Sequence, residues 1–218
     1  MRLKFLPSFV KRRGRITKKQ QENLKYLSSF SVKDINDIKN ECSKFKLCCL
    51  EIGFGNSDNL CKQAIENPEI FFIGSEVYMS GIGSLIGNIK ENSISNIKIF
   101  PDDIRILLDK NSEEIFDIVQ ILCPDPWPKD RHHKRRLINQ DFLAMLNNSM
   151  KKNASLYIST DWKNYAENIQ SAIEDSGFFK PTAKKFLKKY YLTKFEKRGQ
   201  DQGREIFEFN YQKLFLKN

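Results

Sequence analysis

The sequence lacks several features that would place it in a common class. It has no apolar run of roughly 18 residues or more, so it contains no candidate membrane-spanning helix. Its N-terminus also lacks the apolar core of a secretion signal. Histidine is scarce: the only two, His132 and His133, have no cysteine or acidic cluster at ligand spacing, which argues against a metal site.

The cysteines do not form a zinc-binding pattern either. There are five, an odd number, and no Cys-x-x-Cys or Cys/His spacing occurs. Most lie within apolar runs, so we expect buried free thiols and therefore a reducing compartment such as the cytoplasm. These residues are Cys42, Cys48, Cys49, Cys61 and Cys123.

Acidic residues are absent before Glu22, whereas the same segment carries eight Lys or Arg. The whole chain has 37 Lys and Arg against 27 Asp and Glu, a formal charge of +10. This excess indicates a polyanionic partner, most simply a nucleic acid; a basic surface that only aids solubility is the alternative. We expect residues 1–30 to form a partly flexible basic arm that contacts phosphates, and an organelle transit peptide is less favoured.

Apolar, β-branched runs alternate with amphipathic segments along the rest of the chain. This alternation predicts a parallel sheet covered by helices on both faces. The predicted strands are Lys46–Gly53, Ile70–Val77, Ile94–Phe100, Phe116–Pro124 and Ser155–Thr160. The predicted helices are 57–67, 80–91, 103–110, 135–152 and 162–176.

The last part of the chain has a different pattern. In "KYYLTKFEKRGQDQGREIFEFNYQKLF", two β-rich runs flank a polar turn, which predicts an antiparallel hairpin at the edge of the sheet. We therefore expect one α/β domain at residues 31–218, with a Rossmann-like, doubly wound, mostly parallel seven-stranded sheet. No internal repeat or low-complexity linker divides it.

Each predicted parallel strand ends at or near a carboxylate. The segments are "EIGFG", "SEV", "PDD", "PDPW" and "STDW". In doubly wound sheets, ligands bind at the carboxyl ends of the strands, near the point where the strand order reverses. These carboxylates are therefore predicted to meet around one ligand.

The first of these segments, Leu50–Leu60, contains a glycine turn. Gly53 and Gly55 permit a tight strand-to-helix turn and a close approach of a ligand to the backbone. The dinucleotide fingerprint needs a third small residue where this chain has Asp58, an acid that would repel a pyrophosphate. A cationic cofactor such as S-adenosylmethionine fits better, with Glu51 facing the cation; the alternative is a plain turn beside a solvated acid.

Two further acids suit the rest of such a cofactor. Glu76 ends the second strand, where an acid accepts hydrogen bonds from ribose hydroxyls, although alone it is equally well a surface acid. Asp102, after the third strand, is a candidate acceptor for an adenine amino group. It is almost as well explained as an N-cap of the next helix, and Asp103 competes for both roles.

The segment "PDPWPKDRHHKRR", Pro124–Arg136, combines rigidity with positive charge. Its prolines restrict the loop around Asp125, the acid that ends the fourth strand, and Trp127 offers a flat face for a stacked base. We expect the basic block Arg131–Arg136 to lie at the start of a helix and to hold a nucleic-acid phosphate there. A solvated charge run is the alternative.

With these motifs, the sequence resembles the bacterial tRNA (guanine-N7-)-methyltransferases. The resemblance covers nearly the whole chain and rests on "SFVKRRGRIT", "LEIGFG", "GSEV", "PDPWPKDRHHKRRL", "STDW" and "TKFEKRG". It implies methyl transfer from S-adenosylmethionine to N7 of a variable-loop guanosine of tRNA, position 46 in tRNA numbering, with S-adenosyl-L-homocysteine as the second product. One departure is Ser57, because the family often has a third glycine there.

The resemblance also implies which residues act. Asp125 is implied as catalytic. The implied cofactor-binding residues are Glu51, Gly53, Gly55, Glu76, Asp102 and Asp125. The implied substrate-binding residues are Lys129, Asp161, Thr193, Lys194, Phe195 and Glu196. The implied RNA-contacting block is Arg131, His132, His133, Lys134, Arg135 and Arg136. From composition alone, Asp161 would be a helix cap and "TKFEKRG" an edge strand with a turn.

The implied reaction needs alignment more than a base. Guanine N7 carries a lone pair and no proton, and positioning it in line with the methyl group supplies much of the rate. We hypothesise that Asp125 stabilises the cation developing on the purine, and that Asp161 and Glu196 accept from the guanine N1–H and amino group. The target base is expected to leave its stack near Trp127.

Two other functions are compatible with the sequence. One is an exocyclic-amino methyltransferase, although its loop would carry two prolines before the aromatic residue where this chain has Asp125-Pro126-Trp127. The other is a non-catalytic RNA-binding protein on the same fold, which would gain nothing from the strand-end acids. For the favoured function we expect tRNA as partner, no membrane, no metal, and a monomer or homodimer.

Overall fold

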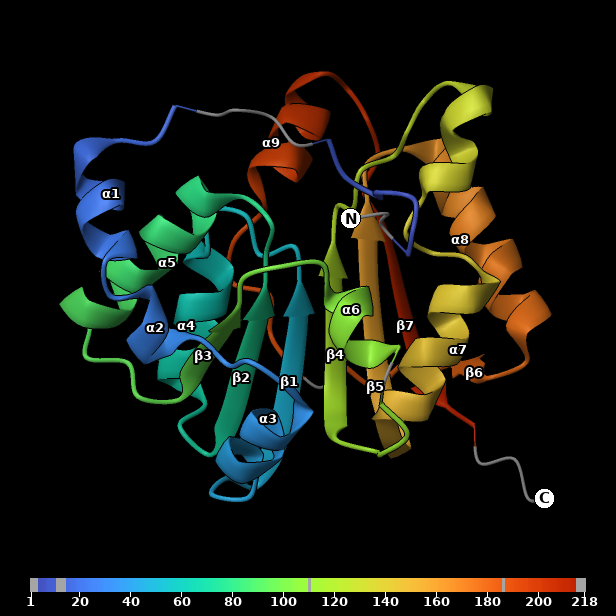
Figure 1. The fold of residues 1–218 in the computed structure, drawn as a ribbon. Coiled ribbons are helices and arrows are strands. Elements are labelled where there is room, and N and C mark those ends of the chain that lie inside the picture. Colours follow the sequence, from blue (N-terminus) through green and yellow to red (C-terminus); the bar gives the residue numbers. More distant parts are fainter. Residues whose placement is uncertain (1–3, 11–14, 110, 186, 215–218) are drawn as a thin grey trace.

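Seven strands form a single mixed sheet in the computed structural model, which describes residues 4–10, 15–109, 111–185 and 187–214 (Figure 1). Their order is β3-β2-β1-β4-β5-β7-β6, and β1 to β5 run parallel. The order reverses between β1 and β4, which places the switch point of a doubly wound sheet there. The strands are β1 (Leu47–Ile52), β2 (Ile70–Ser75), β3 (Ile97–Phe100), β4 (Phe116–Leu122), β5 (Met150–Thr160), β6 (Phe179–Pro181) and β7 (Phe207–Lys213).

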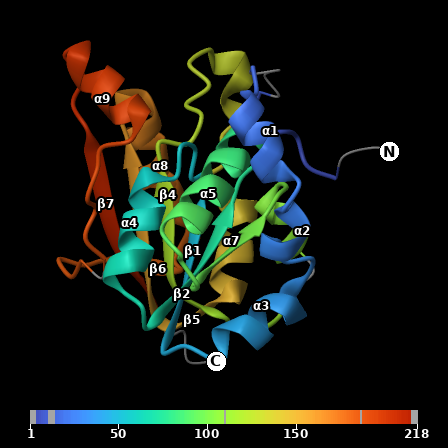
Figure 2. The same cartoon turned by 90° about the vertical axis from the view of Figure 1, so that its left-hand side faces the viewer.

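Helices cover the two faces of the sheet and build two apolar layers (Figures 1 and 2). One layer joins the sheet to α3, α6, α7 and α8, and the other joins it to α4 and α5, with α1 packed on α5. The helices are α1 (Lys18–Leu24), α2 (Leu27–Phe30), α3 (Ile35–Cys42), α4 (Asp58–Glu66), α5 (Met79–Glu91), α6 (Ile104–Leu108), the 3-10 helix η1 (Asp130–Arg135), α7 (Gln140–Ser149), α8 (Lys163–Ser176) and α9 (Lys194–Asp201).

Burial on both faces explains why the central strands are so apolar. All six residues of β2 are buried, and so are five of the six residues of β1. A parallel strand flanked by helices has no solvent face, and its sequence therefore reads as a continuous apolar run. These runs made the parallel strands predictable, and the predicted fold class is confirmed.

The basic segment after β4 is not the start of an α-helix, as the sequence analysis expected. Residues 130–135 form the 3-10 helix η1, and α7 begins only at Gln140, with Asn139 as its N-cap. The helix was also predicted to run to residue 152, but β5 already begins at Met150. The expectation that the basic block lies at the start of an α-helix is therefore wrong, and its contact with a nucleic-acid phosphate stays a prediction.

The antiparallel pair at the sheet edge exists, but one strand lies elsewhere in the chain. Strand β7 pairs with β5 and with β6, which precedes the segment that was expected to supply the hairpin's first strand. Within that segment, Thr193 and Glu196 form a capping box and start α9. The Thr-x-x-Glu spacing was a helix signal that competed with the β-rich composition.

The N-terminal segment belongs to the fold over much of its length. Thr17 caps α1, and Gln20 and Asn23 bind Ser84 and the Gly83 carbonyl of α5. The basic residues Lys11–Arg13 lie outside the described residues. No helix in the described part of the chain is long and apolar enough to cross a membrane.

The expectation of free thiols holds for Cys49, Cys61 and Cys123. It fails for Cys42 and Cys48, which the structure joins as a disulfide between the end of α3 and the start of β1.

Candidate active site

A cavity of about 390 Å³ opens at the carboxyl ends of β1, β2, β3 and β4, beside the switch point. Its wall contains residues from every segment that the sequence analysis singled out at these strand ends, together with residues of the N-terminal arm and of α9. The predicted site residues in this wall are Gly53, Gly55, Glu76, Asp102, Asp125, Lys194 and Phe195.

The glycine turn after β1 leaves its surface open to a ligand. Gly53 and Gly55 have φ angles of 76° and 56°, in the left-handed region that glycine adopts without strain. A Cβ atom at either position would meet no other atom within 4 Å, so the space above them is free. Ser57 adopts the third left-handed conformation, with φ 68°, and its hydroxyl accepts from Asn88 Nδ2 at 3.2 Å. Ser57 thus takes the backbone shape that a glycine would have.

Glu51 is a buried acid with an unused acceptor. It lies on β1 directly before Ile52 and Gly53, two residues of the cavity wall. Its Oε2 atom is buried and has no hydrogen-bond partner among the described residues. Burial raises the pKa of Glu51 to about 8, and the charge of Glu76 adds to the rise. A cation placed here would restore the charged form of the carboxyl.

Glu76 is held rigidly at the end of β2. Its Oε1 accepts the N–H groups of Val77 and Tyr78 at 2.7 and 3.0 Å, and its Oε2 accepts that of Gly55 at 2.9 Å. Burial nevertheless raises the pKa of Glu76, and the charge of Asp125 adds to the rise. The charge of Glu76 thus acts on Glu51, and that of Asp125 acts on Glu76, which links the acids of β1, β2 and β4 electrostatically.

The structure separates the roles of Asp102 and Asp103. Asp103 is the N-cap of α6 and also binds the Arg105 guanidinium, with Nη2–Oδ2 at 2.6 Å. Asp102 is exposed in the cavity wall, and its Oδ1 accepts only the neighbouring Asp103 N–H in the described structure. The helix-cap role therefore belongs to Asp103, and Asp102 keeps an oxygen for a ligand.

The loop after β4 presents Asp125 to the cavity. Cys123 and Trp127 have left-handed φ angles of 49° and 45°, unusual for residues with side chains. Arg136 holds the loop from inside the protein, where it is only 3% exposed. Its guanidinium donates to the Pro126 carbonyl at 2.9 Å and to Asn164 Oδ1 at 2.7 Å. Arg136 thus differs from the rest of the basic block, because its guanidinium is used inside the protein.

The remaining basic block lies on the surface. Arg131 and Lys134 are exposed, and His132, His133 and Arg135 are partly so. Burial and the neighbouring cations, Arg131 first among them, lower the pKa of His132. Lys129, just before η1, is also exposed.

Trp127 is less open than a stacking platform requires. Its indole N–H donates to the Ser8 carbonyl at 2.9 Å, Arg135 lies over its ring at 5.0 Å, and His132 meets its edge. Ser8 and Phe9 of the arm also line the cavity. The arm therefore closes part of the site, a role that its basic composition gave no reason to predict.

Cys123 lines the cavity but is not a nucleophile. Burial raises the pKa of its thiol to about 12, and the nearby Glu196 adds to the rise. At neutral pH the sulfur is therefore protonated, and the thiolate that a covalent route would need is absent.

The predicted substrate segment forms α9, which is tied to β5. Glu196 is 0% exposed: its Oε1 accepts from Ser159 at 2.8 Å and pairs with Lys189, while its Oε2 accepts the Thr193 N–H at 2.7 Å. This network holds α9 so that Lys194 and Phe195 line the cavity at the carboxyl ends of the strands. The Phe195 side chain is 56% exposed.

Asp161 lies in a neighbouring hollow of about 420 Å³ with Trp162, Arg204 and Phe207. It is not a helix cap, since Trp162 is the N-cap of α8. Arg204, which the sequence analysis missed, pairs with the Asp161 carboxylate at 3.1 Å. Nothing in the local sequence around residue 204 indicated this long-range partner.

Known proteins resemble this chain over most of its length. The model of a family described as putative methyltransferase matches residues 46–209. A protein of Nitrosococcus oceani named tRNA (guanine-N(7)-)-methyltransferase is 36% identical over 95% of this chain and 91% of its own length. Proteins with the same name from Methylobacillus flagellatus and Buchnera aphidicola are 37% and 38% identical over 94% and 96% of this chain, and over 90% and 92% of their own lengths.

The chain belongs to the tRNA (guanine-N(7)-)-methyltransferase family. It is thus a methyltransferase, as the sequence resemblance implied.

Two solved structures resemble it in fold. One, titled as the structure of an antibiotic-related methyltransferase, has a TM-score of 0.58 and 20% identity and covers 86% of this chain and 98% of its own. The other is a mutant 16S rRNA (adenine(1408)-N(1))-methyltransferase of Catenulisporales acidiphilia with the cosubstrate SAM, at a TM-score of 0.60 and 14% identity, covering 88% and 97%. Identities this low show a shared fold alone.

Proposed function

We propose that this methyltransferase transfers the methyl group of S-adenosylmethionine to N7 of the guanosine at position 46 of tRNA. The proposal rests on the acids gathered at one rim of the sheet, in a chain whose relatives carry that enzyme name. Because the substrate is a cytoplasmic RNA, the protein is proposed to act in the cytoplasm.

The residues of the cavity fit a cationic, phosphate-free cofactor. The orphaned Oε2 of Glu51 needs a positive partner, and an ammonium or sulfonium group would supply it. Glu76 and Asp102 retain acceptor capacity for ribose hydroxyls and an adenine amino group, and Gly53 and Gly55 leave room for them. When bound, the cofactor supplies a methyl group on a positively charged sulfur.

Asp125 is the proposed catalytic residue. During transfer, positive charge moves onto the purine, and a fixed carboxylate at the end of β4 stabilises that charge. No general base is required, because N7 has no proton to lose. The stiff loop from Pro124 to Pro128 holds the carboxylate in place, so that little reorganisation accompanies the reaction.

The neighbouring segments are proposed to hold the guanosine. Phe195 offers an exposed ring at the cavity. Asp161 is an acceptor for the adjacent N1–H and 2-amino group of guanine, whereas adenine has no 2-amino group and its N1 is an acceptor that a carboxylate would repel. Glu196 has both oxygens engaged within the protein, so we assign it to holding α9 rather than to the base. Lys129, Arg131 and Lys134 are proposed to contact the RNA backbone.

The test is to incubate tRNA that lacks the modification with labelled S-adenosylmethionine and to identify the labelled nucleoside. Label in 7-methylguanosine at position 46 supports the proposal, and a transcript with adenosine at that position should accept none. Label in an amino-methylated base would instead establish the exocyclic-amino reaction. No label, with tight tRNA binding, would establish a non-catalytic binder.

A further inference from the structure

One part of the sheet face on the α4 side is polar. Strands β4, β5 and β7 alternate side chains between the two faces, and on the opposite face Val119 and Leu156 are buried in the apolar layer. A doubly wound sheet normally buries apolar residues on both faces. Here the residues turned toward the α4 side are mainly polar: Gln120, Ser155, Tyr157, Glu208 and Asn210.

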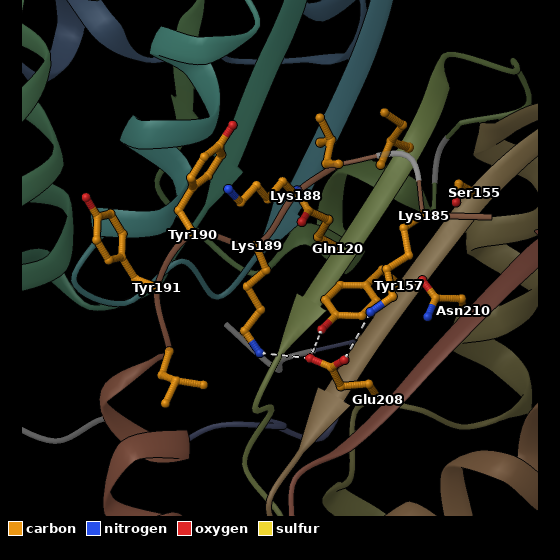
Figure 3. Close-up of a pocket in the computed structure, with 13 residues that line it drawn as sticks. Gln120, Ser155, Tyr157, Lys185, Lys188, Lys189, Tyr190, Tyr191, Glu208 and Asn210 are labelled. Atoms are coloured by element: carbon orange, nitrogen blue, oxygen red, sulfur yellow. Dashed lines mark hydrogen bonds and ion pairs between the residues drawn. The ribbon is translucent and has the colours of Figure 1, made fainter. Parts of the chain in front are cut away.

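Among the described helices, α4 reaches this polar area at Gln120, through the side chain of Gln63. The segment between β6 and α9 crosses the rest. We call residues 182–185 and 187–192 of this segment the strap. Between the strap and the strands lies a cavity of about 500 Å³, into whose wall the strap contributes lysines and tyrosines (Figure 3). Figure 3 shows Lys185 and Lys189 directed toward Glu208 of β7, and Lys188 and Tyr190 on the α4 side.

The cavity carries an excess of positive charge. Lys185 and Lys189 share the single carboxylate of Glu208, at 3.5 and 3.3 Å, and the Tyr157 hydroxyl donates to it at 2.6 Å. Lys188 places its ammonium 5.0 Å from the centre of the Tyr190 ring. Lys189 also pairs with Glu196, so the three ammonium groups meet two carboxylates. The remaining excess of one positive charge suits an anionic occupant.

The strap leads directly from this cavity to the active site. Tyr191 and Leu192 are 51% and 47% exposed, and Phe195, three residues further, is the exposed ring at the methyl-transfer cavity. The Thr193 hydroxyl donates a hydrogen bond to the sulfur of Cys123, which belongs to the wall of the methyl-transfer cavity, at 3.6 Å. Lysines interleaved with exposed aromatic rings are the pattern that holds the phosphates and bases of single-stranded nucleic acid.

The strap is already fixed in position. The Lys188 carbonyl accepts from Gln63 at 2.9 Å, and the Tyr190 N–H donates to Asn59 at 2.9 Å, so both anchors lie on α4. Helix α4 follows the glycine turn of the cofactor cavity. A surface that is ordered before binding loses less conformational entropy when its partner arrives.

We propose that the strap is a second RNA-binding surface, which holds the tRNA strand adjoining the methylated guanosine. Lys185 and Lys188 contact its phosphates, and Tyr191 stacks on one of its bases. This inference rests on the proposed function, since it takes tRNA as the substrate. The strap leads into the N-cap of α9, whereas the basic block at η1 follows β4, so the two are separate surfaces of the protein.

The test compares tRNA binding by the wild type with that of two double variants of equal charge. Lys185→Ser with Lys188→Ser removes two strap lysines and leaves Lys189 in place to hold Glu196. Lys33→Ser with Lys44→Ser removes two exposed lysines on either side of α3, at the amino ends of the strands (Figure 1). A single variant, Tyr191→Ala, tests the stacking. Filter binding is measured over a range of salt concentrations, and 7-methylguanosine formation is measured in parallel.

The strap double variant should raise the Kd for tRNA about tenfold and reduce the slope of log K against log salt by about 1.5, as two lost phosphate contacts predict. The α3 variant should change neither by more than about twofold. Tyr191→Ala should weaken binding about tenfold with an unchanged salt slope, because stacking releases no counterions.

Equal Kd values and slopes for the two double variants would overturn the inference, even if the wild type forms 7-methylguanosine normally. A strap variant that turns a wild-type dimer into a monomer in size-exclusion chromatography, with tRNA binding retained, would overturn it in favour of contact between copies. Absence of 7-methylguanosine with the wild type would instead refute the proposed function, and the binding comparison would still decide whether the strap holds RNA.

Discussion

Arg204 and Asp161 form an ion pair across two segments that are far apart in sequence, with Arg204 Nη2 3.1 Å from Asp161 Oδ2. The guanidinium also lies over the Trp162 ring at 5.5 Å, and its buried Nε has no hydrogen-bond partner in the described structure. Asp161 follows β5 and Arg204 follows α9. The pair therefore fixes the carboxylate that we assign to guanine recognition.

Replacing Arg204 should weaken the recognition of tRNA without changing the affinity for the cofactor. We expect Arg204→Met to lower kcat/KM for tRNA about tenfold or more, because a largely enclosed carboxylate loses its partner. The Kd for S-adenosylmethionine, measured by calorimetry, should stay within about twofold. Arg204→Lys should recover only part of the loss, since an ammonium cannot stack on Trp162 as a guanidinium does. A normal KM and kcat in Arg204→Met would show that the pair has no part in recognition.

Gly199 is the point at which α9 touches Asp161. A Cβ atom at this position would lie 2.7 Å from Asp161 Oδ2 and 2.8 Å from its Cβ. Alanine favours a helix interior over glycine by about 1 kcal/mol, so Gly199→Ala should strengthen α9 itself. We nevertheless expect a fall in kcat/KM of about tenfold. The added methyl group forces Asp161 to shift, and a small displacement of a residue that positions the substrate lowers the reaction rate strongly. Lys197→Ala, on the exposed side of the same helix, is the matched control and should retain wild-type kinetics.

The buried acid Glu51 should make stability depend on pH in the ligand-free protein. Its pKa is about 8 in the folded state, above the ordinary value of 4.5. Between these values the folded state binds more protons than the unfolded state, so this group lowers stability as pH rises, by up to about 1.4 kcal/mol per pH unit. Glu51→Gln should therefore flatten the fall in Tm from pH 5 to 8, measured by calorimetry, and should gain most at pH 8. A wild-type slope in the variant would remove Glu51 as its cause.

Cofactor binding should also release a proton through Glu51. At pH 7 the carboxyl is mostly protonated, and a cation beside it restores the charged form. Titration calorimetry in buffers of different ionisation enthalpy measures that proton, which Glu51→Gln should not release.

Close packing of α1 on α5 should control how the arm covers the cavity. A Cβ atom at Gly83 would lie 2.8 Å from the backbone oxygen of Gln20, whereas at Gly87 it would meet only the end of the Asn23 side chain. We expect Gly83→Ala to displace α1, to lower Tm by several degrees and to weaken cofactor binding several-fold, because Gln20, Ser8 and Phe9 line the site. Gly87→Ala should be milder, since only the end of the Asn23 side chain has to shift, at the cost of its hydrogen bond to the Gly83 carbonyl. Equal effects of the two changes would contradict this packing role.

Asp125 should be required for chemistry and not for folding or RNA binding. We expect Asp125→Ala to slow single-turnover transfer at saturating cofactor about 100-fold or more, as removal of one preorganised electrostatic group does elsewhere. Asp130→Ala, a fully exposed acid on the same loop, is the control and should stay active. Rapid turnover by Asp125→Ala would take this carboxylate out of the mechanism.

Local patterns predicted the parallel half of the sheet and the strand-end positions of the acids. The strands β1, β2 and β4 are buried on both faces, so their apolar runs are a direct consequence of burial. The glycine turn could be predicted because only glycine adopts left-handed φ angles without steric strain. Ser57 shows the limit of that rule, because a contact with Asn88 accompanies the same backbone shape.

Residues with two opposing signals were harder to predict. Arg136 ends a basic run that suggested a surface patch, yet it is buried because Pro126, Asn164 and the Tyr165 ring take up its guanidinium. The β-rich run that begins at Lys189 was expected to form the first strand of a hairpin, but a capping box at Thr193 started a helix instead. For Arg136, partners that only the folded chain brings close outweighed a local signal, whereas at Thr193 one local signal outweighed another.

The sequence by itself determined the element types of the core and the order in which the acidic residues reach the rim, because periodicity and chain direction are local properties. Only the tertiary structure decided which acids face a shared cavity, that the arm covers it, and that Arg204 meets Asp161. Such choices depend on burial and on charges from segments many residues apart, and a carboxylate or guanidinium acquires its role from whichever neighbours remove it from water.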